Sequence, residues 1–164
     1  MGEPLVECLL QVTGDSAALN TFDKRFRSGT GPQWSDRPCD GTPRYSLHAL
    51  FPVPEEIQRR GYQRAGHLWC RDYWKTPDDL TGMQVKRVRG ERNYRFFTLK
   101  CEPASVFWKV SADFPSLHLR LVLLGTDKGD LQSGFFYEGR YQASYSPDGA
   151  DSFAAICKEM GVAV

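Results

Sequence analysis

Hydrophobic and polar residues alternate in several segments of this chain, which is the period of a β-strand with one buried face. The clearest case is residues 116–125, where every second residue from Leu117 to Leu123 is a leucine and His118 and Arg120 lie on the other side. The same period predicts strands over residues 4–12, 44–51, 93–99 and 133–143. The chain therefore has enough strands for one sheet.

Three segments instead repeat their hydrophobic residues every three to four positions, as amphipathic helices do. Residues 16–26 form the first, and Asp15 or Ser16 can cap it. Pro103 suits the first turn of the second helix, and Pro115 ends it. A short helix near the C-terminus is the third. The predicted buried stripes are Leu19, Phe22 and Phe26, then Phe107, Val110 and Phe114, and finally Phe153, Ile156, Cys157 and Met160.

The order of these elements is βα, β, a long excursion, βα, ββ and α. With 164 residues, of which 41% are hydrophobic, the chain has material for one core, so we predict a single domain over residues 1–164. Its class is α+β, and the simplest arrangement is a ferredoxin-like sandwich: an antiparallel sheet with two helices on one face. A polar, basic excursion at residues 69–95 and the short C-terminal helix are additions to it. The aromatic residues Phe96, Phe97, Phe107 and Trp108 are expected in the core.

Three segments carry a resemblance to a known family: FPVPEEI at residues 51–57, LWCRDYWKT at 68–76, and the long block at 96–140. In that block an aromatic strand, a proline-led helix, a Phe-Pro break, a strand, a turn and GFFYEG follow one another. This order is similar to that of the YubB-like ferredoxin-fold proteins of phages and plasmids. The resemblance implies a mobile-element context, where small proteins disable host defences or manage DNA transfer.

Charge is unevenly distributed, although the whole chain carries a formal net charge of only +1. Residues 57–100 hold eleven Lys or Arg against four Asp or Glu, a net charge of +7. Arginines beside aromatic rings suit phosphate contacts, base stacking or a protein interface, whereas a run of charge is often only a solvated face. The candidate partner-binding residues are Trp69, Tyr73 and Trp74 as hydrophobic anchors and Arg71, Lys86, Arg87, Arg89 and Arg92 as charged contacts.

Metal and thiol chemistry have weaker support in the sequence. His67 and Cys70 are three residues apart, but structural zinc takes four ligands and no second such pair exists. We therefore expect no metal and no cofactor, and we expect reduced, structural thiols because five cysteines are an odd number. A small enzyme that uses Cys70 or Cys101 is the third hypothesis for function. It ranks last because no nucleophile, base and orienting group occur together as a set.

The leading hypothesis is a non-catalytic protein of a phage or plasmid that inhibits a host defence system. The favoured case is an anti-CRISPR that binds an interference protein or ribonucleoprotein complex stoichiometrically. The alternative is a nucleic-acid-binding accessory protein that uses the same basic stretch, and weak non-specific nucleic-acid binding is compatible with both hypotheses. We expect the bacterial cytoplasm as the compartment, and no membrane, because no hydrophobic run approaches the roughly 18 residues that a membrane span needs.

Overall fold

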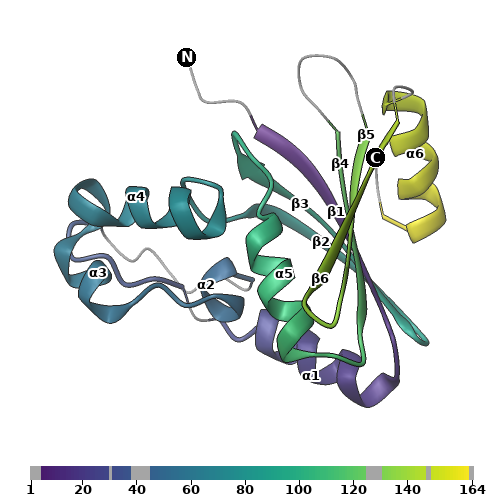
Figure 1. Ribbon diagram of the computed structural model, residues 1–164, viewed down its shortest axis with the longest axis horizontal. Coiled ribbons are helices and arrows are strands. Elements are labelled where there is room, and N and C mark those ends of the chain that lie inside the picture. The colour runs from purple at the N-terminus through teal and green to yellow at the C-terminus, as the bar shows by residue number, and fades with distance from the viewer. Residues whose placement is uncertain (1–4, 30, 38–44, 125–130, 147–148, 163–164) are drawn as a thin grey trace.

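The computed structural model describes residues 5–29, 31–37, 45–124, 131–146 and 149–162. Its centre is one antiparallel sheet of six strands in the order β2-β3-β1-β4-β5-β6 (Figure 1). The strands are β1 Leu5–Thr13, β2 Thr81–Val88, β3 Glu91–Leu99, β4 His118–Leu124, β5 Leu131–Tyr137 and β6 Arg140–Ser146. The predicted α+β class and the antiparallel sheet are confirmed.

Two helices, α1 (Ser16–Phe26) and α5 (Ala104–Asp113), cover one face of this sheet. The carboxylate of Asp15 caps α1 by accepting hydrogen bonds from the backbone N–H groups of Ala17 at 3.0 Å and Ala18 at 3.2 Å. The predicted stripes of both helices and the leucines of β4 meet in one hydrophobic core. Leu121 and Phe107 are both buried there, as the hydrophobic periods predicted.

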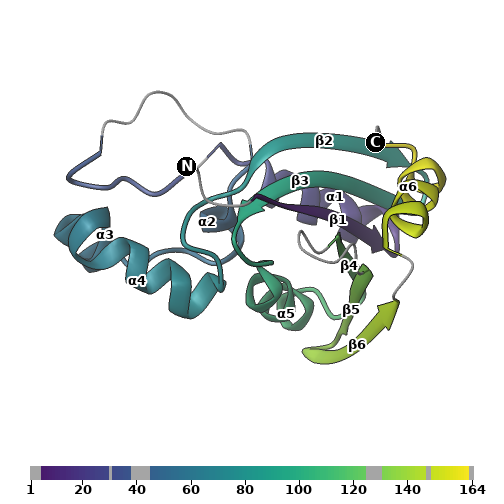
Figure 2. The same ribbon diagram turned by 90° about the horizontal axis from the view of Figure 1, so that it is seen from above.

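The third predicted helix, α6 (Gly149–Met160), lies on the opposite face of the sheet. Phe153 and Cys157 of α6 pack with Leu9 of β1 and Val122 of β4 in a second, smaller core. Figure 2 shows α6 at the end of the sheet that is farthest from α3 and α4. The sheet is thus covered by helices on both faces, but by α6 on only part of the second one.

The remaining helices form a separate layer beside α5 (Figure 1). They are α2 (Leu47–Leu50), α3 (Glu55–Arg60) and a longer helix made of η1 (Tyr62–Gly66), α4 (His67–Trp69) and η2 (Cys70–Trp74). The carboxylate of Asp36 begins this longer helix, because it accepts hydrogen bonds from the backbone N–H groups of Tyr62 and Gln63 at 2.7 and 2.9 Å. The helix carries several of the candidate binding residues.

The strand predicted over residues 44–51 is wrong. The side chain of Ser46 accepts a hydrogen bond from His48 N–H at 3.1 Å and caps the short helix α2 instead. Leu47 and Leu50 then lie on the same side of one helical turn and are both fully buried. A three-residue spacing of leucines in so short a segment fits a helical turn better than a strand.

The single strand predicted over residues 133–143 is in fact two strands. Glu138 and Gly139 form a tight turn between β5 and β6, and both have positive φ angles, 51° and 72°. Two such residues in succession make the turn that matches the twist of a hairpin. The turn predicted between the strands at residues 116–125 and 133–143 falls on residues 126–130, which lie outside the described residues.

The basic excursion is also different from what the charge pattern suggested. Residues 81–95 belong mostly to β2 and β3, which pair with each other and, through β3, with β1. The polar character of β2 reflects its position at one edge of the sheet, where most of its side chains are exposed. Within the described residues, no helix is long and apolar enough to cross a membrane.

Candidate functional site

Two aromatic side chains of the longer helix form a stacked, partly exposed pair. Trp69 and Tyr73 are one helical turn apart, so they lie on the same side of the helix. Their ring centroids are 4.9 Å apart at an interplanar angle of 24°, and the Phe51 ring packs edge-on against Trp69 at 5.4 Å. Tyr73 is 51% exposed, whereas Trp69 is partly buried against the core. The Tyr73 ring is therefore exposed, and its stacking on the partly buried Trp69 ring holds it in place.

A second stacked pair joins α5 to β6. The rings of Trp108 and Tyr141 lie 5.3 Å apart at an interplanar angle of 29°. Trp108 is 46% and Tyr141 43% exposed, and Trp108 Nε1 donates a hydrogen bond to the carbonyl of Gly139 at 2.6 Å. This hydrogen bond ties α5 to the β5–β6 turn, so the second pair is also held in place.

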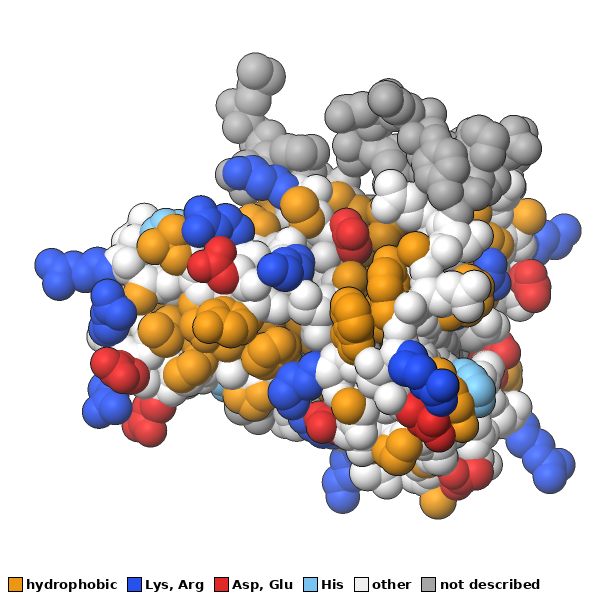
Figure 3. All heavy atoms as spheres, in the orientation of Figure 1, with side chains coloured by type: hydrophobic (Ala, Val, Ile, Leu, Met, Phe, Trp, Pro, Cys, Tyr) orange, Lys and Arg blue, Asp and Glu red, His pale blue; other side chains and the backbone are white. Residues whose placement is uncertain are grey.

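We call Trp69, Tyr73, Trp108 and Tyr141 together the paired-aromatic surface. Figure 3 shows hydrophobic side chains gathered on one face of the molecule, over the helical layer and over the region of α5 and the neighbouring strands. Lys109 follows Trp108 on α5, and its Nζ lies 5.5 Å from the centroid of the Phe51 ring, which packs against Trp69. Aromatic residues with a cation among them are the composition of protein interfaces.

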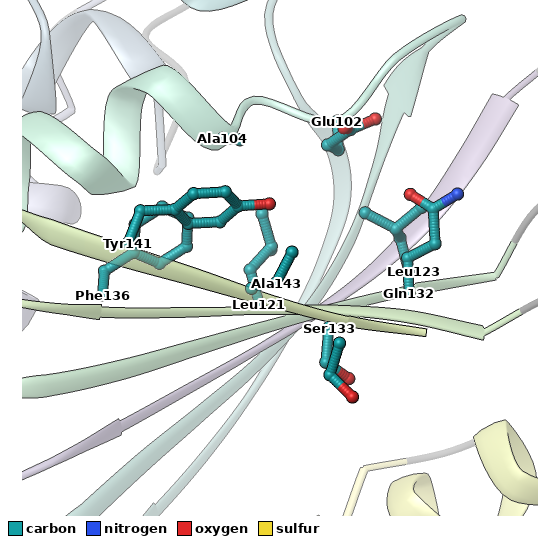
Figure 4. Close-up of a pocket in the computed structure, with 11 residues that line it drawn as sticks. Glu102, Ala104, Leu121, Leu123, Gln132, Ser133, Phe136, Tyr141 and Ala143 are labelled. Carbon is teal, nitrogen blue, oxygen red and sulfur yellow. The ribbon is translucent and has the colours of Figure 1, made fainter. Parts of the chain in front are cut away.

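A pocket of about 200 Å³ opens beside Tyr141 (Figure 4). It lies between the start of α5 and the sheet, with Leu121 and Phe136 among its hydrophobic walls and Glu102 and Gln132 among its polar ones. Figure 4 shows the Tyr141 ring extending into this space.

A glycine keeps that pocket open. A Cβ atom at Gly134 would lie 2.8 Å from the Tyr141 ring and 3.2 Å from the Phe136 ring. Any larger residue at this position would thus displace the rings that form one wall. The result is a cavity with hydrophobic walls at the margin of the paired-aromatic surface.

The charged groups near the paired-aromatic surface are largely paired with one another. Arg71 Nε lies 3.1 Å from a carboxylate oxygen of Asp72, and Lys109 Nζ lies 3.2 Å from one of Asp113. Both ion pairs are exposed enough for water to weaken them, so they add little stability. Each of these pairs couples a basic side chain of the region to a carboxylate on the same helix.

Trp74 does not belong to this surface, although the sequence predicted it as an anchor. The side chain is fully buried, and its Nε1 donates a hydrogen bond to the carbonyl of Phe51 at 2.8 Å. Because it follows Tyr73 directly, the helix turns it about 100° toward the core. Trp74 is thus a core residue that fixes the position of Trp69, whose ring it meets edge-on at 5.8 Å.

The basic residues predicted beside these anchors lie elsewhere. Figures 1 and 2 both place the β2–β3 turn at the far end of the sheet from α4. The eight residues of β2 alone span about 25 Å. Trp69, Arg71 and Tyr73 therefore do not form one surface with the predicted contacts of the hairpin, which are Lys86, Arg87, Arg89 and Arg92.

Two of those hairpin arginines have structural partners. Arg87 Nε donates to the buried carboxylate of Asp23 at 2.9 Å, and Arg87 Nη2 donates to the Tyr45 hydroxyl at 2.7 Å. Arg92 donates to the side-chain oxygen of Asn20 at 2.7 Å. Lys86 and Arg89 are exposed. The basic hairpin thus holds its strands to α1 with two of its four cations.

His67 and Cys70 are separated by their environments. His67 Nδ1 lies 2.8 Å from the carbonyl oxygen of Tyr62, and Cys70 is buried. Burial, together with the charges of Asp78 and Asp79, raises the pKa of the Cys70 thiol to about 12. A thiol with that pKa is protonated at neutral pH and is a poor nucleophile or metal ligand.

No group of three His, Cys, Asp or Glu side chains that could hold a metal ion occurs in the described part of the chain. Each histidine has a different neighbour. His48 Nδ1 accepts a hydrogen bond from Val53 N–H at 2.9 Å, and His118 stacks on Tyr137. Cys101 is exposed, in a turn where its backbone N–H donates to the Leu99 carbonyl.

Sequence reasoning missed Trp108 and Tyr141. We expected Trp108 in the core from the spacing of the aromatic residues, but a helix turns adjacent residues such as Phe107 and Trp108 about 100° apart. Trp108 lies off the stripe of Phe107, Val110 and Phe114, and this offset was a usable signal for exposure. Tyr141 carried no such signal, because the strand that holds it was not separated from its neighbour.

Comparisons with known proteins show the fold and nothing about chemistry. No family model matches this chain, and no curated protein matches it. Among solved structures it is similar to the crystal structure of a protein api92 from Yersinia pseudotuberculosis, described as family-model DUF1281. The TM-score is 0.67 at 10% sequence identity, over 88% of this chain and 98% of that one. This likeness supports the mixed α+β fold.

Proposed function

We propose that this chain is a non-catalytic binding protein that docks on a partner protein through the paired-aromatic surface. The observation that carries the proposal is the presence of two stacked ring pairs whose outer members, Tyr73 and Trp108, are 51% and 46% exposed. Exposed Trp and Tyr side chains that cluster in this way are the residues that dominate binding energy in protein interfaces.

The fixed positions of the rings strengthen this proposal. Trp69 packs against Phe51 and Trp74, and Trp108 is hydrogen-bonded to Gly139. Side chains that are already ordered lose little conformational entropy on binding, so more of the contact energy appears as affinity. An aromatic surface that served only to cover the core would not need both pairs to be exposed.

The pocket beside Tyr141 gives the surface a place for an anchoring side chain. Its volume of about 200 Å³ is on the scale of one large hydrophobic side chain, and Leu121 and Phe136 form part of its walls. Anchors that fill such pockets are the usual centres of protein interfaces. A polar group at the tip of that partner side chain could form a hydrogen bond with Glu102 or Gln132, which also line the pocket.

The fold is further proposed to be ferredoxin-like. Four strands in the order β2-β3-β1-β4, with α1 after β1 and α5 after β3, follow the βαββαβ pattern, and β5 and β6 extend the sheet beyond β4. This order is compatible with the YubB-like family, which the sequence resembles. On that resemblance we propose that the protein comes from a phage or plasmid and acts in the cytoplasm of a bacterial host.

In that context the proposed partner is a protein of a host defence system, and an anti-CRISPR role is the favoured case. Binding would block the partner stoichiometrically, without a reaction. The nucleic-acid alternative at the basic hairpin has less support, because Arg87 and Arg92 are engaged with Asp23 and Asn20. A Cys70-dependent enzyme has less support still, since that thiol is buried with a raised pKa.

The test measures interference and binding with the same variants. In a plasmid-interference assay, cells that carry an active CRISPR system should accept a targeted plasmid when they express this protein. Tyr73→Ala should abolish that protection and weaken binding to the purified interference complex by at least about 2 kcal/mol if Tyr73 is a central contact. Leu5→Ala is the control, because Leu5 is also 51% exposed but lies on β1, outside the surface.

Nuclease treatment of the purified complex separates protein contacts from nucleic-acid contacts. Unchanged binding after treatment supports docking on protein. If Tyr73→Ala and Leu5→Ala both behave as wild type, the paired-aromatic surface is not the docking site. If no panel of interference complexes binds, the anti-CRISPR case is excluded.

A further inference from the structure

The sheet face opposite α1 and α5 is only partly covered. α6 packs over Leu9, Val122 and Leu131. Figure 1 shows α6 alongside one end of β4 and β5, whereas the β5–β6 turn lies at the opposite end of these strands. Two cross-strand rows of side chains follow on this uncovered part. One runs through Gln11, Arg120, Phe135 and Gln142, and the other contains Thr13, His118, Tyr137 and Arg140.

On β1, β4, β5 and β6 these rows are rich in rings and cations and contain no aliphatic side chain; on β3 and β2 they continue to Asn93 and Lys86 and to Glu91 and Val88. His118 and Tyr137 stack with centroids 4.0 Å apart and an interplanar angle of 4°. Phe135 is 43% exposed, and the guanidinium carbon of Arg120 lies 5.7 Å from its centroid. A hollow of about 380 Å³ lies at this end of the sheet, with these three rings in its lining. We call these two rows the open sheet face. Its exposed rings distinguish it from the solvent face of an ordinary strand.

The spacing of the rings fits an extended strand of nucleotides. Phe135 and Tyr137 are two residues apart on β5, so they stand about 7 Å apart along the strand. Bases in a duplex repeat about every 3.4 Å along one strand, so only an unstacked single strand places one base on each ring. Stacking on aromatic side chains of a sheet is a common mode of single-strand recognition.

The charges favour the same ligand. Arg120 and Arg140 contribute two cations to the rows. Arg140 is paired with Glu138 at 2.7 Å, but its side chain is 75% exposed and the pair is weak enough for a phosphate to compete. Gln11 and Gln142 supply amide groups that can hydrogen-bond base edges without fixing a sequence.

We propose that the open sheet face binds single-stranded nucleic acid, with bases stacked on Phe135 and on the His118–Tyr137 pair and phosphates held by Arg120 and Arg140. The residues that would hold the strand are not those of the paired-aromatic surface, although Tyr141 of that surface also lines the hollow beside Phe135 and Tyr137. The proposed site also differs from the basic hairpin, because none of the residues that would hold the strand lies between residues 86 and 95. Protein docking and nucleic-acid binding are therefore independent claims.

The experiment is a fluorescence anisotropy titration of the full chain with labelled 12-nucleotide poly(dT), poly(U) and a 12-base-pair duplex. Wild type should bind the single strands more tightly than the duplex, with an affinity that falls as salt rises. The comparison of poly(dT) with poly(U) shows whether the ribose 2′-hydroxyl contributes. Phe135→Ala should weaken single-strand binding roughly 5- to 150-fold, which corresponds to one lost stacking contact.

Matched variants separate this site from others. Leu68→Ala removes a side chain of similar exposure, 40%, from α4 and should leave binding unchanged. Arg120→Gln should weaken binding and flatten its salt dependence, whereas Arg89→Gln on the hairpin should do neither. Equal binding of duplex and single strand, loss with Arg89→Gln but not with Arg120→Gln, or wild-type binding by Phe135→Ala would each overturn the proposal.

Discussion

Removing Arg87 should destabilise the fold, although the side chain is basic, lies on an edge hairpin and is 40% exposed. Its partner Asp23 is only 7% exposed and also accepts a hydrogen bond from the Tyr94 hydroxyl at 2.7 Å. In Arg87→Ala the Asp23 carboxylate loses its counter-charge while it stays buried. Burial and the neighbouring Asp23 charge raise the pKa of Tyr94, so this tyrosine stays neutral and cannot respond by ionising.

The expected cost lies between two limits. Breaking a fully buried ion pair costs about 3 to 5 kcal/mol, and an exposed pair is worth about 0 to 1 kcal/mol. Because Arg87 is partly exposed, water can replace some of its contacts, and we expect Arg87→Ala to lower the free energy of unfolding by about 1 to 3 kcal/mol. Arg89→Ala on the same hairpin should change it by less than about 0.5 kcal/mol.

The assay is urea unfolding followed by tryptophan fluorescence, with the midpoint and slope compared among variants. A double-mutant cycle with Asp23→Asn adds a second criterion, since the two changes should be strongly non-additive if the side chains act as a pair. Equal midpoints for Arg87→Ala and Arg89→Ala, or an additive cycle, would refute the assignment of Arg87 as a structural residue.

Three further predictions concern stability. Leu121→Ala should cost about 2 to 5 kcal/mol in the same urea assay, as a large-to-small change in the core, and a loss below about 0.5 kcal/mol would contradict the core assignment. Burial raises the pKa of Asp79 to about 6 in spite of its hydrogen bonds from Ser46 and two backbone amides. The protonated carboxyl therefore contributes its full stability below about pH 4, and the free energy of unfolding should fall by up to about 3 kcal/mol as the pH rises through 6. Asp79→Asn should flatten that pH dependence in urea melts from pH 4 to 7. Gly66→Ala should lower the melting temperature, because a Cβ there would lie 2.5 Å from the Trp34 ring, and an unchanged melting temperature would show that the ring moves freely.

The elements with a strong hydrophobic period could be predicted from the sequence. Leu117, the leucines at 119, 121 and 123 on β4, and Phe107 and Val110 on α5 were predicted in the core, because a period of two residues or of three to four decides which face is buried. The turn at Glu138–Gly139 was missed because aromatic residues continue on both sides of it. The hydrophobic pattern alone does not reveal a turn within such a run, and only the residue types at the turn itself could have indicated it.

The candidate site was predictable only in part. Trp69 and Tyr73 were both predicted as anchors, but their segment was predicted as part of the excursion, and the helix that puts them on one side was not predicted. Trp108 and Tyr141 come from α5 and β6, and only the tertiary packing brings them into contact. Charge was the least reliable guide, because the net charge of a segment does not reveal that Arg87 lies against a buried carboxylate on another element.

The most direct test of the proposed function is the affinity of a purified CRISPR interference complex for wild type and for Tyr73→Ala, measured by surface binding after nuclease treatment. The account predicts nuclease-resistant binding that Tyr73→Ala weakens by at least about 30-fold, while Leu5→Ala binds as wild type. Wild-type affinity in Tyr73→Ala, with both variants folded, would contradict the claim that the paired-aromatic surface docks on the partner.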